Sequence, residues 1–238
     1  MYTIERCVRY SDCGADGKLT LANVINYFQD CSTAQSEHLG VGVGYMKKQR
    51  RAWILVAWQI CINRIPELHE EVITKTWPTS FKTFFGTRNY VLESKDGETL
   101  VYANSIWTYL DIDAGRPAKI PQEEIDIYGV EPEFPMEHAP RKIKVGEGGC
   151  EEEKFRVYRY HLDTNNHVNN GKYIEMAMEY IPETVSVKQV RVEYKKSALY
   201  GDVIVPKVTE EEERRVVELR DEAGIPYAVV EIIGEEKR

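Results

Sequence analysis

The stretch "HLDTNNHVNNGKYIEMAMEY", residues 161–180, places one Asp, four Asn and two His in its first ten positions and then changes to a helical pattern. Apolar side chains at Tyr173, Ile174, Ala177 and Met178 recur at the spacing of one helix face. The sequence therefore predicts a helix that begins near Asn170, with a polar cluster directly in front of it.

The same helical pattern occurs earlier in the chain, behind the short segment "GADGKL", residues 14–19. A shift of 149 residues aligns the two patterns, which indicates an internal repeat. The aligned pairs are Val24 with Tyr173, Ile25 with Ile174 and Phe28 with Ala177.

Strand-like stretches follow both helices in the same order. "WILVAWQICINRI", residues 53–65, corresponds to "SVKQVRVEYKKSA", residues 186–198, and each half ends in a hairpin. Turns are expected at Asp96-Gly97 in the first hairpin and around Ala223-Gly224 in the second. Each half is thus predicted to be one long helix followed by about four antiparallel strands, which is an α+β arrangement.

A segment rich in Pro and Gly separates the two halves. Residues 111–152 carry mixed charge and little periodicity, so they are predicted to form a long connection across a surface. We therefore expect an N-terminal domain at 1–120, a linker at 121–152 and a C-terminal domain at 153–238.

The composition excludes several classes of function. The net charge of -8 argues against a nucleic-acid binder, because phosphate contacts need a surplus of Lys and Arg. No run of eighteen apolar residues occurs and the first residues show no apolar leader, so no membrane insertion is expected. The five cysteines form no CxxC pair, which favours a reducing compartment and a cytoplasmic location.

The pattern Asp-x-Asn-x-His-Val-Asn-Asn-x-x-Tyr at residues 163–173 resembles the signature of hot-dog thioesterases. The form with Asn165, together with the internal repeat, resembles the acyl-acyl-carrier-protein thioesterases of plants and bacteria, which have two tandem hot-dog domains. "SIWTYLDIDAGRPAKIP" (105–121) and "VEYKKSALYGD" (192–202) are similar to further segments of that family. The resemblance implies that the chain releases free fatty acid from acyl carrier protein and that the N-terminal domain holds the acyl chain. The sequence does not fix the oligomeric state, and a homodimer is one candidate assembly.

The chain departs from the plant members of that family at one place. A Glu-Cys pair follows the basic dipeptide in the plant enzymes, whereas this sequence has Ser197 and Ala198, and no cysteine occurs after Cys150. A thiol nucleophile in the second half is therefore excluded, and the chemistry must rest on the Asn-rich cluster.

The cluster contains the groups that thioester hydrolysis needs. Asp163 is predicted to activate water or to attack the carbonyl carbon directly. In an extended segment Asn165 and His167 would point the same way as Asp163, so Asn165 would orient the water or the carboxylate and His167 would assist proton movement. The first amides of the helix at Asn169 and Asn170 would polarise the carbonyl oxygen, assisted by the helix dipole.

An alternative reading of the cluster is structural, since Asn and Asp in front of a helix commonly cap its amides. The first half is an internal control, because Lys18 falls where His167 stands and Leu19 falls where Val168 stands. Capping does not require the cluster there. This difference favours a catalytic role and a single site per chain.

The basic run "KKQRR", residues 47–51, stands out in an acidic chain. It is either a solvated loop or a docking patch for acidic acyl carrier protein, formed by Lys47, Lys48, Arg50 and Arg51. No metal or cofactor is expected, because the other histidines lack partners at ligand spacing and are interpreted as surface or hydrogen-bonded side chains, namely His38, His69, His138 and His161.

Other function classes use the same fold. An acyl-CoA thioesterase would use the same Asp and helix terminus but needs a site for the nucleotide phosphate. A regulator that binds acyl-CoA without hydrolysis should lack the Asp and carry a DNA-binding segment, and a dehydratase places its His and acid differently. Asp163 is present and no such DNA-binding segment is evident, so the acyl-CoA thioesterase is the main alternative.

Overall fold

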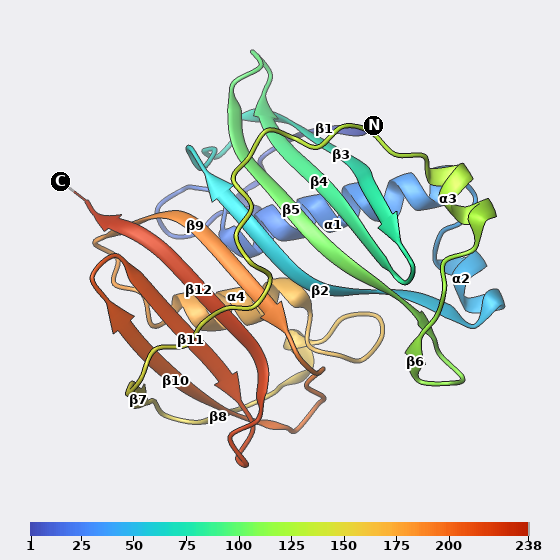
Figure 1. Ribbon diagram of the computed structural model, residues 1–238. Coiled ribbons are helices and arrows are strands. Elements are labelled where there is room, and N and C mark those ends of the chain that lie inside the picture. The colour runs from blue at the N-terminus through green and yellow to red at the C-terminus, as the bar shows by residue number, and fades with distance from the viewer. Residues whose placement is uncertain (238) are drawn as a thin grey trace. The chain divides into compact units, whose positions relative to one another are not determined.

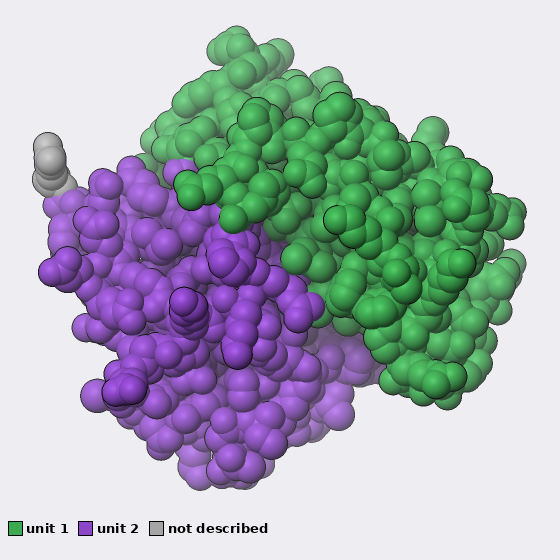
Figure 2. Space-filling model, in the orientation of Figure 1, with its two compact units in different colours: residues 1–56, 63–138 green, residues 57–62, 139–238 purple. Residues whose placement is uncertain are grey.

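The computed structural model describes residues 1–237, and its contacts divide the chain into two compact units (Figures 1 and 2). The first unit comprises residues 1–56 and 63–138, and the second comprises residues 57–62 and the chain from residue 139 onward. The strand β2 (Arg51–Ile62) therefore contributes to both units. The expected linker at 121–152 is likewise divided between the two units.

A long helix packs on an antiparallel sheet in the first unit (Figure 1). The helix α1 (Leu21–His38) begins after Thr20, whose Oγ1 accepts the N–H of Asn23 at 3.2 Å. Its buried face contacts the sheet, and the ring of Phe28 lies 5.1 Å from the ring of Tyr90. The predicted α+β arrangement is confirmed for this half.

The sheet of the first unit has the strand order β1-β3-β4-β5-β2. The repeat pattern did not predict β1, nor the two short helices that flank the long strands. The elements are β1 (Tyr2–Cys7), the 3-10 turn η1 (Tyr10–Asp12), α2 (Val43–Gln49), β3 (Glu71–Lys82), β4 (Phe85–Ser94), β5 (Thr99–Asp111), β6 (Arg116–Pro117) and α3 (Gln122–Tyr128).

The second unit repeats the plan with a shorter helix. The helix α4 (Asn170–Met178) has nine residues against eighteen in α1, and it ends before Ile181, to which the apolar pattern extends. Pro182 follows closely, and a proline disfavours helical backbone in the residue before it. The helix of this half is therefore present but shorter than the repeat pattern predicts.

The strands of the second unit follow the order β2-β9-β12-β11-β10-β7, with β8 paired to β10. Residues 57–61 of β2 pair with residues 193–189 of β9. The elements are β7 (Cys150–Glu151), β8 (Phe155–Arg156), the 3-10 turn η2 (Arg159–His161), β9 (Val185–Tyr194), β10 (Val203–Glu211), β11 (Arg214–Arg220) and β12 (Pro226–Glu236).

Both predicted hairpin turns are present. The N–H of Gly97 donates to the carbonyl of Ser94, and the N–H of Gly224 donates to that of Asp221, at 3.0 Å in each case. Both glycines have positive φ, 87° and 81°, which L side chains rarely adopt. The chemistry of these short turns was readable from their sequence.

The segment that joins the two halves of the chain packs on strands of each unit. In the first unit the N–H of Phe134 donates to Asn89 Oδ1 at 2.9 Å, and Trp77 Nε1 donates to the carbonyl of Pro132 at 2.9 Å. In the second unit Ile143 packs in a buried cluster with Val216 and Val229. We call residues 130–149 the strap, because they run across the strands (Figure 1).

A buried carboxylate fixes the second part of the strap. Glu231 on β12 is 3 % exposed and binds Arg191 and Arg214, each at 2.6 Å. The same two guanidinium groups donate to the carbonyls of Pro140 and Lys144. Glu231 thus connects three neighbouring strands with the strap.

No helix within residues 1–237 is both long and apolar enough to cross a membrane.

We expect Glu231→Ala to lower the free energy of unfolding by about 3–5 kcal/mol, because it leaves two partly buried guanidinium groups without their shared carboxylate. Denaturant unfolding measures this change. The control is Glu210→Ala, which removes an exposed partner of Arg215 and should cost less than about 1 kcal/mol. Equal losses in the two variants would contradict the role assigned to Glu231.

Candidate active site

The Asn-rich segment forms a tight turn in front of α4. Leu162 and Val168 pair as an isolated β-bridge, and the N–H of Asp163 donates to the carbonyl of His167 at 2.8 Å. Asn166 has a φ of 61°, in the left-handed region that Asn tolerates better than most residues. The extended conformation predicted for residues 163–167 is therefore wrong, because the chain reverses direction at Asn166.

The turn gathers the predicted residues around one carboxylate. Asp163 Oδ1 accepts the N–H of Asn165 at 2.8 Å and the N–H of His167 at 3.2 Å. Asp163 is half-buried, whereas the side chains of Asn165 and His167 are exposed. The structure thus brings these three residues together through the backbone, and it shows that Asp163 also stabilises the turn.

The first unit contains the same turn without the cluster. The N–H of Gly14 donates to the carbonyl of Lys18 at 2.9 Å, and Gly17 has a φ of 73°. Gly14, Gly17 and Lys18 stand 149 residues before Asp163, Asn166 and His167. The turn therefore forms with glycine in place of Asp163, so backbone geometry alone does not account for the carboxylate.

Asn169 is the N-cap of α4. Its Oδ1 accepts the N–H of Gly171 at 2.8 Å, its carbonyl accepts the N–H of Lys172 at 2.9 Å, and its own N–H donates to the carbonyl of His161 at 2.9 Å. The amides of residues 169, 171 and 172 are thus engaged within the chain. Capping is confirmed for Asn169, and these three amides are not available as oxyanion donors in this conformation.

Asn170 is the first residue of α4, and its carbonyl accepts the hydroxyl hydrogen of Tyr194 at 2.9 Å. The N-terminal end of α4 still carries the positive end of the helix dipole next to the turn. A negative charge that develops there is favoured without a direct hydrogen bond from the first amides.

The loop after β9, with Ser197 and Ala198, lies against the turn. The N–H of Val168 donates to the carbonyl of Ala198 at 3.0 Å, and the N–H of Ala198 donates to the hydroxyl of Tyr173 at 2.9 Å. Burial raises the pKa of Tyr173 to about 12, so this hydroxyl stays protonated near neutral pH. Ala198 is fully buried and supports the site through its backbone, not through a reactive side chain.

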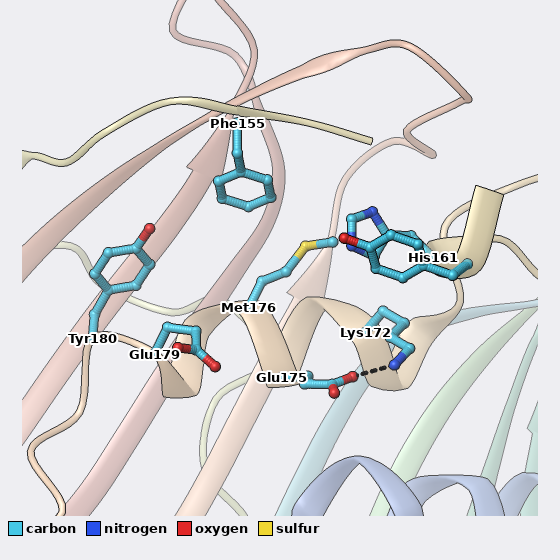
Figure 3. A pocket seen from close by; sticks show the side chains of 8 residues that line it. Phe155, His161, Lys172, Glu175, Met176, Glu179 and Tyr180 are labelled. Carbon is cyan, nitrogen blue, oxygen red and sulfur yellow. Dashed lines mark hydrogen bonds and ion pairs between the residues drawn. The ribbon is translucent and has the colours of Figure 1, made fainter. Parts of the chain in front are cut away.

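A cavity of about 400 Å³ lies between α4, η2 and β8 (Figure 3). Its lining mixes apolar and charged side chains, and Figure 3 shows the Met176 side chain extending toward His161, with the ion pair of Lys172 and Glu175 on the same helix. Asp163 is not among the lining residues. The complete lining is Phe155, Tyr160, His161, Lys172, Glu175, Met176, Glu179 and Tyr180.

The first unit fills the corresponding space. A shift of 149 aligns Tyr27 with Met176 and Asp12 with His161. The hydroxyl of Tyr27 donates to Asp12 Oδ2 at 2.6 Å, and the Arg6 guanidinium carbon lies 4.1 Å from the centroid of the Tyr27 ring. The smaller Met176 leaves room in the second unit, which explains why the cavity occurs beside α4.

His161 is buried, and its Nδ1 accepts the N–H of Tyr158 at 3.0 Å. Burial lowers the pKa of His161, and the nearby Lys172 ammonium lowers it further. The interpretation of His161 as a hydrogen-bonded structural histidine is thus confirmed. Within residues 1–237, no group of three or more His, Cys, Asp or Glu side chains is arranged to hold a metal ion.

Two of the four basic residues of "KKQRR" are already paired. The Arg50 guanidinium binds Asp113 at 2.6 Å, and the Arg51 guanidinium binds Asp111 at 3.0 Å. Lys47 and Lys48, in the last turn of α2, are exposed and make no ion pair within the described residues. The docking role predicted for this run would therefore depend mainly on the two lysines.

Sequence reasoning missed the residues that support the turn from outside the motif. The hydroxyl of Tyr194 and the backbone of Ala198 come from β9 and from the loop that follows it. The carbonyl of His161 accepts the N–H of Asn169, the N-cap of α4. One of these contacts had a signal in the sequence: the repeat aligns His161 with Asp12, and each of these residues accepts the N–H of the helix N-cap.

Comparison with known proteins gives matches over both halves. The family model described as acyl-ACP thioesterase N-terminal domain matches residues 1–128, and the acyl-ACP thioesterase C-terminal domain matches residues 147–232. The chain is 28% identical over 206 residues to acyl-[acyl-carrier-protein] hydrolase FATB2 of Cuphea viscosissima, covering 79% of this chain and 50% of that protein. It is 26% identical to oleoyl-acyl carrier protein thioesterase 2 of Arabidopsis thaliana, covering 91% and 65%. The chain thus spans about half the length of several relatives that it matches.

Solved structures show the same fold. An acyl-ACP thioesterase from Bacteroides thetaiotaomicron superposes with a TM-score of 0.89 at 21% identity, covering 98% of this chain and 97% of that one. The 12:0-ACP thioesterase from Umbellularia californica superposes with a TM-score of 0.87 at 18% identity, covering 99% and 97%. The fold of two tandem hot-dog domains is thereby confirmed.

The lowered pKa of His161 predicts a pH dependence of stability. The folded state binds the His161 proton more weakly than the unfolded state does, so stability is full above the unfolded pKa of about 6.5 and is lost as the pH falls below it. His161→Asn keeps an acceptor near the Tyr158 amide and cannot be protonated. The difference in unfolding free energy between the parent and this variant should therefore shrink between about pH 7.5 and about pH 5.5. A constant difference across this range would contradict the burial of a neutral His161.

Proposed function

The chain belongs to the acyl-ACP thioesterase family, and we propose that it hydrolyses the thioester of acyl carrier protein to release a free fatty acid. The observation that carries this proposal is the half-buried Asp163 carboxylate in the turn at the start of α4, where the first unit has Gly14 in the same turn. The carboxylate lies in the half that also carries Asn165 and His167. This asymmetry supports one site per chain.

The carboxylate of Asp163 is the proposed reactive group. It either removes a proton from the water that attacks the carbonyl carbon, or it attacks that carbon and forms an anhydride that water then hydrolyses. In both routes the C–S bond breaks, the thiolate takes a proton, and the carboxylate is regenerated. The amides of residues 169, 171 and 172 are already engaged within the chain, so they do not donate to the oxyanion. The positive end of the α4 dipole stabilises the oxyanion instead.

Asn165 and His167 are the proposed assisting residues. Their amides bind the same Asp163 oxygen, so their exposed side chains start from fixed backbone positions beside the carboxylate. We assign to Asn165 the orientation of water or carboxylate, and to His167 the movement of the proton toward the leaving thiol. Ser197 and Ala198 supply no thiol nucleophile.

The carrier, the assembly and the location remain proposals of the same kind. The exposed Lys47 and Lys48 are proposed to attract an acidic carrier, whereas Arg50 and Arg51 are paired with aspartates. The homodimer and the cytoplasmic location stay predictions. Acyl-CoA is the alternative substrate, and a panel of acyl chains offered on carrier protein and on CoA separates the two classes.

We expect Asp163→Asn to abolish thioester hydrolysis and to leave the fold intact, because the amide oxygen can still accept the two turn hydrogen bonds while the charge is lost. Thiol release from acyl carrier protein measures the activity. The matched control is Asp16→Asn, since Asp16 Oδ1 accepts the N–H of Lys18 in the corresponding turn of the first unit. Parent-level turnover in Asp163→Asn, or an equal loss in Asp16→Asn, would remove Asp163 from the mechanism.

His167→Ala should lower kcat by about 10²–10⁴-fold, the usual contribution of an assisting acid or base, and should leave the affinity for substrate largely unchanged. Steady-state kinetics on carrier-bound substrate checks this expectation. Lys18→Ala alters the residue at the same place in the first unit and serves as the control. If both variants retain parental kcat, His167 only shapes the turn.

A further inference from the structure

A group of apolar side chains is exposed beside the candidate active site. Tyr158 is 50 % exposed, Tyr160 is 70 % exposed, Leu199 is 48 % exposed and Tyr200 is 58 % exposed. Leu199 pairs with His167 as an isolated β-bridge, and the rings of Tyr158 and Tyr160 stack with centroids 5.8 Å apart. Exposed apolar side chains that cluster in this way mark surfaces that bind a partner.

The internal repeat shows that the fold does not require these side chains. The positions that correspond to Tyr158, Tyr160 and Leu199 in the first unit are occupied by more polar residues. A shift of 149 gives Arg9 for Tyr158 and Ser11 for Tyr160, and the matching β-bridge of Lys18 gives Glu67 for Leu199. At these three positions, exposed apolar side chains therefore occur in the half that carries Asp163 and not in the first unit.

Two arginines without ion pairs in the described residues flank these tyrosines in the sequence. Arg156 and Arg159 are exposed, and neither is within 4 Å of a carboxylate in the described residues. The Arg159 guanidinium carbon lies 5.4 Å from the centroid of the Tyr200 ring, within the range of a cation–π contact. This contact keeps the guanidinium next to an aromatic surface and leaves its charge uncompensated.

The charges of its lining exclude the cavity beside α4 as a site for an anion. Glu175 and Glu179 line it, and the ammonium of Lys172 is paired with Glu175 at 2.5 Å. An anionic group would meet carboxylates there. The uncompensated positive charge lies at Arg156 and Arg159 instead.

We propose that acyl carrier protein docks on this surface, which we call the docking face and define as Arg156, Tyr158, Arg159, Tyr160, Leu199 and Tyr200. The two guanidinium groups bind the phosphodiester of the carrier arm and the acidic side chains around it, because guanidinium donors match phosphate and carboxylate geometry. The tyrosines and Leu199 supply the apolar contact, since Tyr and Arg are typical of interface cores. The proposal rests on the proposed function. It places the direct contact next to Asp163 and leaves to Lys47 and Lys48 a long-range attraction of the acidic carrier.

The test compares charge reversal at two places. Arg156→Glu with Arg159→Glu reverses the docking face, and Lys47→Glu with Lys48→Glu reverses the same number of exposed charges in the first unit. Tyr200→Ala tests the apolar contact, and Tyr10→Ala removes a tyrosine that is 84 % exposed in the first unit as its matched control. Each variant is assayed with one acyl chain carried either on acyl carrier protein or on N-acetylcysteamine.

We expect the double arginine variant and Tyr200→Ala to lower kcat/KM for the carrier-bound chain by about tenfold, while turnover of the N-acetylcysteamine thioester changes by less than about twofold. The Kd for carrier protein without an acyl chain should rise by a similar factor in a fluorescence titration. Tyr10→Ala should match the parent, and the double lysine variant should lose less than the double arginine variant.

Several results would overturn the docking face. An equal loss in the arginine and lysine variants would show general attraction by positive charge, and an equal loss on both substrates would show damage to the turn. A change from dimer to monomer in the arginine variant, with an unchanged Kd for the carrier, would assign the surface to a second copy of the chain. The titration needs no turnover, so a chain that binds carrier through these residues without hydrolysing the thioester would refute the proposed function alone.

Discussion

The hydrogen bond between the carbonyl of His161 and the N–H of Asn169, at 2.9 Å, fixes the start of α4 relative to the turn before it. Its counterpart in the first unit joins Asp12 to Thr20 at 3.1 Å and fixes the start of α1. In each unit this bond closes a loop whose far end reverses at a residue with positive φ. Because backbone groups make the bond, the side chains within the loop are free to differ between the two halves.

The two halves use that freedom differently. The first unit fills its loop with small residues such as Gly14 and Gly17, and its long helix α1 covers the strands beside it. The second unit carries a carboxylate, amides and an imidazole in the loop, and its helix has half as many residues. The second unit thus differs from the first by a polar loop in front of a short helix and by a cavity beside that helix.

The strap illustrates how a segment of irregular sequence becomes structured. The strap crosses buried strands, so its backbone N–H and C=O groups need hydrogen-bond partners there. An unpaired buried polar group costs about 1–3 kcal/mol. Asn89 and Glu193 accept amide hydrogens from the strap, and the two arginines bound to Glu231 donate to its carbonyls. Polar side chains on the strands thus take the place of a neighbouring strand.

The sequence alone determined the internal repeat, the main strands that follow each helix, the two hairpin turns and the position of the Asn-rich cluster in front of a helix. These features depend on residues close together in the chain, such as the glycines at 97 and 224, whose turns form locally. Tertiary structure decided the reversal at Asn166, the division of β2 between two units, the support of the turn by Ala198 and Tyr194, and the pairing of Arg50 and Arg51 with aspartates on a distant segment. The reversal at Asn166 is a local turn that the polar residues of the segment did not reveal. The other features depend on distances between residues that lie far apart in the chain, and periodicity and spacing contain no information about such distances.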